Sequence, residues 1–224
     1  MTWPSVIVIN PNSTRSVTRG IDDALEPLRL PGGATIECRT LEEGPPGIQT
    51  QHDIEQVILP LCRLIADERS AAAFVIACFS DPGIQLARAS TRRPVFGIAE
   101  AGVTTALNRG NDVGIISILP IAVRRHNRYF RSLGLDSRIA GDRAVNLGVL
   151  DLADEERTMR RMTETGRELR DKDGADVLVL GCAGMARYRI ELERVLEIPV
   201  IDPTQAAVGM ALAAAQLGYR GIPA

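Results

Sequence analysis

The chain has 224 residues, of which 45% are hydrophobic, so it can bury a core for one large domain or for two small ones. Its 26 basic and 28 acidic residues give a formal net charge of -2, which provides no broad attraction for nucleic acid or for an anionic membrane. We therefore expect a small neutral or mildly charged molecule as the partner, with no role for nucleic acid or a membrane.

Short apolar runs alternate with amphipathic segments along the whole chain. We expect strands over residues 5–10, 34–41, 73–78, 94–98, 113–118 and 146–152, within the apolar run 175–186, and over 200–201. Helices are expected over residues 14–28, 53–68, from 82 onward, 100–108, 121–133, 154–173, 185–196 and 205–217. This alternation predicts an α/β fold with parallel sheets covered on both faces.

Targeting and metal-binding signals are weak. The N-terminal apolar run is too short for the core of a signal peptide, and no late stretch approaches the ~18 apolar residues of a membrane span. A cytoplasmic location is expected, where the cysteines at 38, 62, 78 and 182 would stay reduced. With no C-x-x-C pair and 2 histidines, no metal site is expected. No glycine-rich phosphate motif follows an expected strand, which disfavours a nucleotide-binding enzyme.

Two of the apolar runs carry a cysteine where the strand ends, AAAFVIACFSDPG at 71–83 and ADVLVLGCAGMA at 175–186. Ligands of an open parallel sheet bind beyond the carboxyl ends of its strands, so Cys78 and Cys182 occupy positions from which side chains reach a substrate. Close to half of the chain separates them, which indicates a weak internal duplication. We expect two facing α/β lobes, residues 1–97 with 203–224 and residues 98–202, with one thiol on each side of the cleft.

Other residues near expected strand ends are candidates for the same cleft. The amide of Asn10 either points into a site or bonds the backbone of its own turn. Gly47 and Ile48 belong to a stiff Gly-Pro-Pro-Gly-Ile loop that is either a cover over the pocket or a surface turn. Ser117 lies at another strand end, and Asp81 is expected to be the N-cap of the helix that follows it.

The remaining chemically active residues are expected to be structural. Cys38 and Cys62 fit the core, and His52 fits a cap or a solvated side chain. The helix over 121–133 is expected to turn its basic face to solvent, with a phosphate or partner contact as the alternative. The residues concerned are Arg124, Arg125, His126, Arg128 and Arg131.

Two opposed thiols can invert a carbon centre. Each cysteine precedes an expected helix start, which would lower the pKa of the thiol and favour the thiolate. One sulfur then removes a proton from one face of a carbon next to a carbonyl, and the other delivers a proton to the opposite face. Backbone N–H groups at Phe79-Ser80 and Ala183-Gly184 would receive the negative oxygen. The alternative is a pair of buried cysteines that act as small hydrophobes.

Five motifs in order along the chain resemble the hydantoin racemase family, which belongs to the aspartate/glutamate racemase superfamily. They are INPNST at 9–14, ACFSDPG at 77–83, PVFGIAEAG at 94–102, LGCAGMA at 180–186 and PVIDPTQAAV at 199–208. The resemblance implies two pseudo-symmetric lobes, no cofactor, a homo-oligomer, and racemisation of 5-substituted hydantoins or allantoin by Cys78 and Cys182. Members that act on free amino acids usually have Asn-Thr or Thr after these cysteines, so the residues present here favour a cyclic amide. The expected substrate shell is Asn10, Gly47, Ile48, Phe79, Ser80, Ser117, Ala183 and Gly184.

Other functions remain open at this stage. The same superfamily contains amino-acid racemases and maleate-type cis-trans isomerases that use two cysteines, and decarboxylases that need a single protonating cysteine. The non-enzymatic alternative is a small-molecule binding protein on a two-lobed scaffold.

Overall fold

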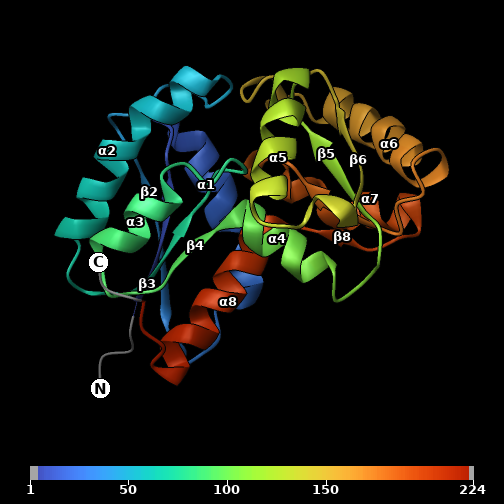
Figure 1. Cartoon of the computed structure of the whole chain (residues 1–224). Helices are drawn as coiled ribbons and strands as arrows, with labels where there is room; N and C mark the ends of the chain where they lie inside the picture. Colours follow the sequence, from blue (N-terminus) through green and yellow to red (C-terminus); the bar gives the residue numbers. More distant parts are fainter. Residues whose placement is uncertain (1–4, 222–224) are drawn as a thin grey trace.

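The computed structural model describes residues 5–221, so residues 1–4 and 222–224 of the predicted first lobe lie outside the described residues. The described chain forms two parallel sheets (Figure 1). The first has the order β2-β1-β3-β4, with β1 Ser5–Asn10, β2 Thr35–Thr40, β3 Ala71–Ile76 and β4 Val95–Gly97. The second has the order β6-β5-β7-β8, with β5 Val113–Ser117, β6 Ile139–Ala144, β7 Val177–Leu180 and β8 Val200–Ile201.

The second sheet repeats the strand order of the first. Every paired strand within both sheets is parallel, and β3 and β7 hold the same place in their respective orders. The predicted α/β class with two pseudo-symmetric sheets is therefore confirmed. A consequence is that the segments after β3 and after β7, which carry Cys78 and Cys182, leave their sheets at equivalent points.

Eight α-helices connect the strands of the described chain and cover the sheets. They are α1 Arg15–Ala24, α2 Gln51–Asp67, α3 Ile84–Ser90, α4 Ile98–Ala106, α5 Pro120–Ser132, α6 Glu155–Asp171, α7 Arg189–Leu196 and α8 Pro203–Leu217. Short 3₁₀ turns lie at Glu26–Leu28, Asp136–Arg138, Asp151–Ala153 and Ala183–Tyr188. Helix α2 begins with a capping box in which Thr50 and Asp53 satisfy each other's backbone N–H groups.

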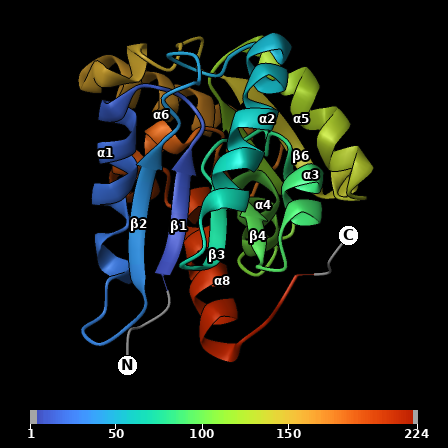
Figure 2. The same cartoon turned by 90° about the vertical axis from the view of Figure 1, so that its left-hand side faces the viewer.

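The alternating side chains of β1 show how both faces of a sheet become buried. Ile7 and Ile9 pack with residues of α2 and α3, whereas Val6 and Val8 join a different cluster, formed with α1, α4 and α8. Figure 2 shows α2 and α3 in front of the first sheet. The cluster around Val6 and Val8 also contains side chains of β5 and β7, so the two sheets share one apolar core. Burial of each such side chain stabilises the folded state by about 1.5–3 kcal/mol.

The last helix returns to the first sheet. Asp202 caps α8 by accepting from the N–H groups of Thr204 at 2.7 Å and Gln205 at 3.2 Å. The helix then packs on β1, β3 and β4, and its other main neighbour is α4. Its small residues allow this close approach: Ala207 and Ala211 are fully buried in the shared core.

The strand expected over 146–152 is wrong. The strand of this region is β6, Ile139–Ala144, which is the half-buried edge of its sheet and whose sequence IAGDRA has no apolar run. The apolar residues Val145, Leu147 and Val149 are buried too, but they reach the core from a loop. The first helix also ends earlier than expected, at Ala24, with a 3₁₀ turn in place of its last part.

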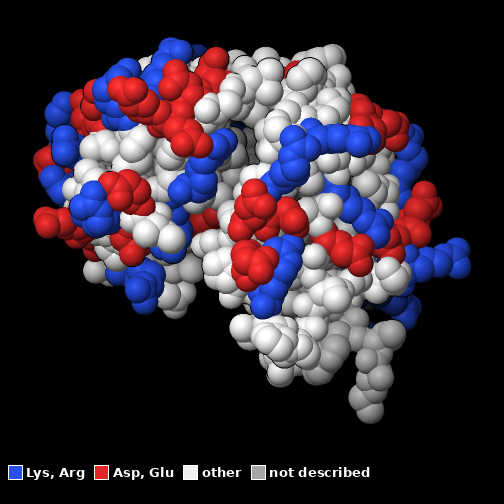
Figure 3. Space-filling view, turned by 180° about the vertical axis from the view of Figure 1, so that it is seen from behind, with Lys and Arg blue, Asp and Glu red and all other residues white. Residues whose placement is uncertain are grey.

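No helix within residues 5–221 is long and apolar enough to cross a membrane. Figure 3 shows basic and acidic side chains interspersed over the face that it presents, without separation by sign. This distribution agrees with the small net charge of the sequence.

Candidate functional site

A cavity lies where the carboxyl ends of strands from both sheets meet. Its lining comes from the segments after β1, β3, β5 and β7, together with two loops and helices α1 and α5, and it contains about 480 Å³ of empty space including its mouth. Cys78, from the first sheet, and Cys182, from the second, both line it. The structure therefore brings the two predicted cysteines to one cavity.

Tight backbone turns hold both cysteines. The Cys78 N–H donates to the Ile76 carbonyl at 3.0 Å, and the Cys78 carbonyl accepts from the Asp81 N–H at 2.9 Å. On the other side, the Gly181 N–H donates to the Ile116 carbonyl at 2.8 Å. A Cβ at Gly181 would lie 2.6 Å from that carbonyl oxygen, so only glycine allows the chain to approach β5 this closely before Cys182.

The expectation of a lowered thiol pKa is wrong for both cysteines. Burial raises the pKa of Cys78 to about 12 and that of Cys182 to about 11. Helix α3 begins only at Ile84, too far from Cys78 to stabilise a thiolate, and Cys182 precedes a 3₁₀ turn. The backbone N–H groups of Ser80 and Gly184 face the sulfurs and oppose the effect of burial in part. These two N–H groups are thus directed at sulfur rather than left open for a substrate oxygen.

The other predicted shell residues divide into two groups. Ile48, Phe79, Ser80, Ala183 and Gly184 line the cavity. Asn10, Gly47 and Ser117 do not.

Asn10 bonds its own turn, which is the second of the two interpretations offered by the sequence. Its amide donates to Asn12 Oδ1 at 3.1 Å and to Thr18 Oγ1 at 3.0 Å, and Asn12 is the residue that reaches the cavity. Gly47 instead packs against Val149, where a Cβ would come within 3.0 Å of the valine side chain.

Asp81 is not the N-cap of the helix that follows it, because Gly83 holds that position. Its carboxylate accepts from the N–H groups of Ala99 at 2.9 Å and Glu100 at 3.0 Å, at the start of α4, and from the Tyr129 hydroxyl at 2.9 Å. Burial nevertheless raises its pKa to about 6. Asp81 itself has a left-handed backbone with φ 41°. The turn that carries Cys78 is thereby fixed to α4 and to α5.

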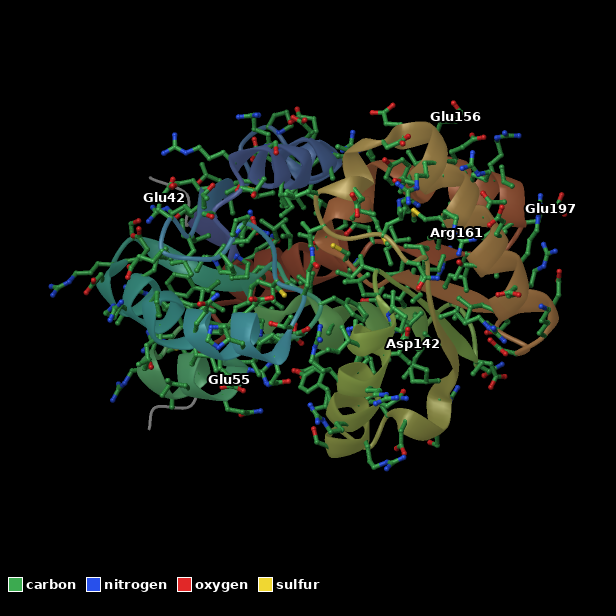
Figure 4. All side chains as sticks on the ribbon, turned by 90° about the horizontal axis from the view of Figure 1, so that it is seen from above. Glu42, Glu55, Asp142, Glu156, Arg161 and Glu197 are labelled. Atoms are coloured by element: carbon green, nitrogen blue, oxygen red, sulfur yellow. The ribbon has the colours of Figure 1, made fainter. Side chains whose placement is uncertain are left out.

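His126 was expected at the surface, and this expectation is wrong. Its side chain is 2% exposed and lines the cavity. Nδ1 lies 2.8 Å from Asp142 Oδ2, and Ser117 Oγ donates to the other oxygen of Asp142 at 2.5 Å. The imidazole also packs edge-on against Phe79, with 5.1 Å between the ring centres. Asp142 is labelled in Figure 4, on β6 beside α5.

The sequence contains a signal for this burial. His126 follows Ala122 by four residues and precedes Phe130 by four, and both of these are buried in α5. Residues at this spacing lie on one face of a helix, so His126 belongs to the apolar stripe. The partner Asp142 has no comparable signal, because the strand that carries it was not predicted.

Arg125 is the second residue of α5 that sequence analysis placed in solvent, again wrongly. It is 9% exposed and lines the cavity. Its Nη1 donates to the Gln49 carbonyl at 2.8 Å, but its buried Nε has no hydrogen-bond partner. Leaving such a donor unpaired costs about 1–3 kcal/mol. The positive charge also favours the thiolate of Cys78.

A second cavity adjoins the first and shares Ser80, Arg125 and His126 with it. It contains about 560 Å³ of empty space, and the rest of its lining is Gln51, Ile54, Arg128 and Tyr129. Within residues 5–221 no group of three or more His, Cys, Asp or Glu side chains is arranged to hold a metal ion.

Comparisons with known proteins agree on one family. The family model described as Asp/Glu/Hydantoin racemase matches residues 6–211. The hydantoin racemase of Paenarthrobacter aurescens is 34% identical over 220 residues, which cover 96% of this chain and 92% of that protein.

Solved structures give the same result. The allantoin racemase from Klebsiella pneumoniae superposes with a TM-score of 0.93 and 30% identity, covering 98% of this chain and 90% of that one. The glutamate racemase RacE1 from Bacillus anthracis, at 15% identity, shares the fold with a TM-score of 0.71, covering 100% of this chain and 86% of that one. Matches of this length and identity show that the chain belongs to the Asp/Glu/hydantoin racemase family.

Proposed function

We propose that this protein is a cofactor-independent racemase of 5-substituted hydantoins or of a related cyclic amide such as allantoin, with Cys78 and Cys182 as its two acid-base groups. The observation that carries the proposal is that two cysteines from equivalent strand ends of two sheets line one cavity. The relatives named hydantoin racemase and allantoin racemase support the substrate class.

The reaction needs only proton transfers. The hydrogen on C5 of the ring is acidic because C5 is bonded to a carbonyl carbon. The thiolate of one cysteine takes this proton, and the electron pair of the C–H bond moves into the carbonyl to form an enolate. The opposite thiol then donates its proton to the other face of C5 and becomes the thiolate. The configuration at C5 is now inverted. The two sulfurs have exchanged their roles as base and acid, so the enzyme is ready for a turnover in the reverse direction.

Arg125 supports the first step at Cys78. Its guanidinium is the positive charge that lowers the free energy of a thiolate at this position, against the effect of burial. No equivalent positive charge acts on the pKa of Cys182, whose shift arises from burial and from the Gly184 N–H.

Solvent exchange tests the proposal. In deuterated buffer, optically pure 5-substituted hydantoins and allantoin should racemise and take up one deuterium at C5, because a thiol exchanges its proton with solvent. Polarimetry measures the racemisation, and mass spectrometry of the same samples measures the uptake of deuterium. Aspartate and maleate complete the panel, since turnover of either in place of a ring would favour the amino-acid racemase or the cis-trans isomerase. Binding of a ring without exchange would contradict an enzymatic role.

The raised thiol pKa values predict the direction of the pH dependence. With pKa values near 12 and 11, both cysteines are thiols at neutral pH and few molecules carry a thiolate. At pH values below these pKa values, each rise of one pH unit increases the thiolate fraction of a cysteine about tenfold, while the opposite cysteine stays a thiol. We expect log kcat/KM to rise with a slope near 1 between about pH 7 and pH 10.

A ring methylated at the imide nitrogen is the control substrate, because it cannot ionise there, and a blank without enzyme corrects for spontaneous racemisation. A profile with its maximum near neutral pH would contradict the assignment of the raised pKa values to the acid-base groups.

A further inference from the structure

One edge of the Arg125 guanidinium, formed by Nε and Nη2, makes no hydrogen bond within residues 5–221. The Nη1 of Arg125 donates to the Gln49 carbonyl, whereas its Nε is buried without a partner. Its Nη2 donates no hydrogen bond within the same residues. The carboxylate of Asp53 acts on Arg125 only through space, because the N–H groups of Gln49 and Thr50 already engage it. Nε and Nη2 together form the side of a guanidinium that grips a carboxylate with two parallel hydrogen bonds.

Arg125 lines both cavities. The second cavity adds Arg128 to Arg125, and neither cavity has an aspartate or glutamate in its lining. The second cavity is otherwise lined by Gln51, Ile54, Ser80, His126 and Tyr129. Arg128 Nη2 donates to Gln51 Oε1 at 3.3 Å. A substituent that leaves a ring near the cysteines and passes Ser80 therefore enters a compartment lined by two arginines, which lie three residues apart on α5.

We propose that Arg125 and Arg128 select rings whose 5-substituent ends in a carboxylate. This inference rests on the proposed function, because it assumes that the reacting ring occupies the cavity of Cys78 and Cys182. The two-atom fork of Arg125 receives both carboxylate oxygens, and Arg128 adds a second charge farther out. An uncharged substituent of the same length leaves the buried Nε unpaired, so it binds more weakly.

The test compares two rings of equal length and shape, 5-(2-carboxyethyl)hydantoin and its amide, 5-(2-carbamoylethyl)hydantoin. The wild type should prefer the acid by about tenfold or more in kcat/KM, the size of one charge-assisted hydrogen bond. Arg125→Gln should abolish the preference, mainly through KM for the acid, whereas Arg125→Lys should retain part of it. Arg128→Gln should reduce the preference by a smaller factor.

Arg131→Gln is the matched control, because Arg131 lies on the same helix, is well exposed and pairs with Asp136 away from both cavities. Arg131→Gln should prefer the acid over the amide by the same factor as the wild type. Equal turnover of acid and amide by the wild type overturns the inference. So does an equal loss for both rings in Arg125→Gln, which would mean that Arg125 serves only Cys78 or a ring carbonyl and does not contact the substituent. If thermal melting shows that Arg125→Gln does not fold, Arg128→Gln decides: an unchanged preference overturns the inference.

Titration calorimetry with the same two rings separates this inference from the proposed function. If neither ring racemises but the acid binds more tightly than the amide, and Arg125→Gln removes the difference, the racemase proposal fails and the carboxylate site stands. If both rings racemise at equal rates and bind equally, the racemase proposal stands and the carboxylate site fails.

Discussion

Replacement of Cys78 or Cys182 by serine is expected to lower kcat/KM for racemisation by about 10³-fold or more, because a hydroxyl is a far weaker acid than a thiol and each turnover needs both groups. The measurement is polarimetry on each pure enantiomer of one ring. Cys38→Ser is the matched control, since Cys38 is also half-buried but lies in β2, outside the cavity. Its activity should stay close to that of the wild type.

The alanine variants Cys78→Ala and Cys182→Ala should also separate the two faces of the substrate. With only Cys78 or only Cys182 present, the remaining sulfur can remove and return a proton on one face alone. Each variant should therefore exchange C5 deuterium in one enantiomer without inverting it, and the two variants should choose opposite enantiomers. Full racemisation by either variant, or exchange of the same enantiomer by both, would defeat the two-thiol mechanism.

Asp81→Ala is expected to cause the largest loss of stability, about 3 kcal/mol or more in the free energy of unfolding. It removes the acceptor of the N–H groups of Ala99 and Glu100 at the start of α4, and of the Tyr129 hydroxyl. Alanine is also strained at a φ of 41°, whereas glycine is not. Urea unfolding followed by circular dichroism measures the change.

Two further variants divide this loss into its causes. Asp81→Gly removes the carboxylate without the backbone strain, so it should be destabilised less than Asp81→Ala. Tyr129→Phe removes one of the three bonds and should cost about 1 kcal/mol. If the free energy of unfolding of Asp81→Ala lies within about 1 kcal/mol of that of the wild type, the carboxylate does not fix this turn in the way that the geometry indicates.

The sequence was sufficient for the elements with strong patterns. Buried parallel strands such as β3 and β7 appear as continuous apolar runs, and turn residues mark their ends, so the positions of Cys78 and Cys182 in the fold followed directly. In contrast, β6 has the mixed composition IAGDRA and every one of its residues is half-buried, so no periodicity distinguishes it from a loop. Asp142, which β6 carries to His126, was missed for this reason.

The electrostatic expectations failed because they depend on surroundings that a linear pattern does not contain. Arg125 and His126 are polar residues of a basic helix, and their burial arises only when β6 and the loop with Gln49 close over α5. The pKa of a thiol likewise depends on the wall of the cavity around it. The helix start next to each cysteine was a local signal, and burial by residues distant in sequence outweighed it.

The return of α8 to the first sheet has a consequence for synthesis. The strands β1, β3 and β4 are complete once residue 97 has been made, but the helix that covers one of their faces begins only at Pro203. A nascent chain on the ribosome therefore exposes this apolar face until translation has almost finished. The sheet translated first is therefore the last to be covered on both faces.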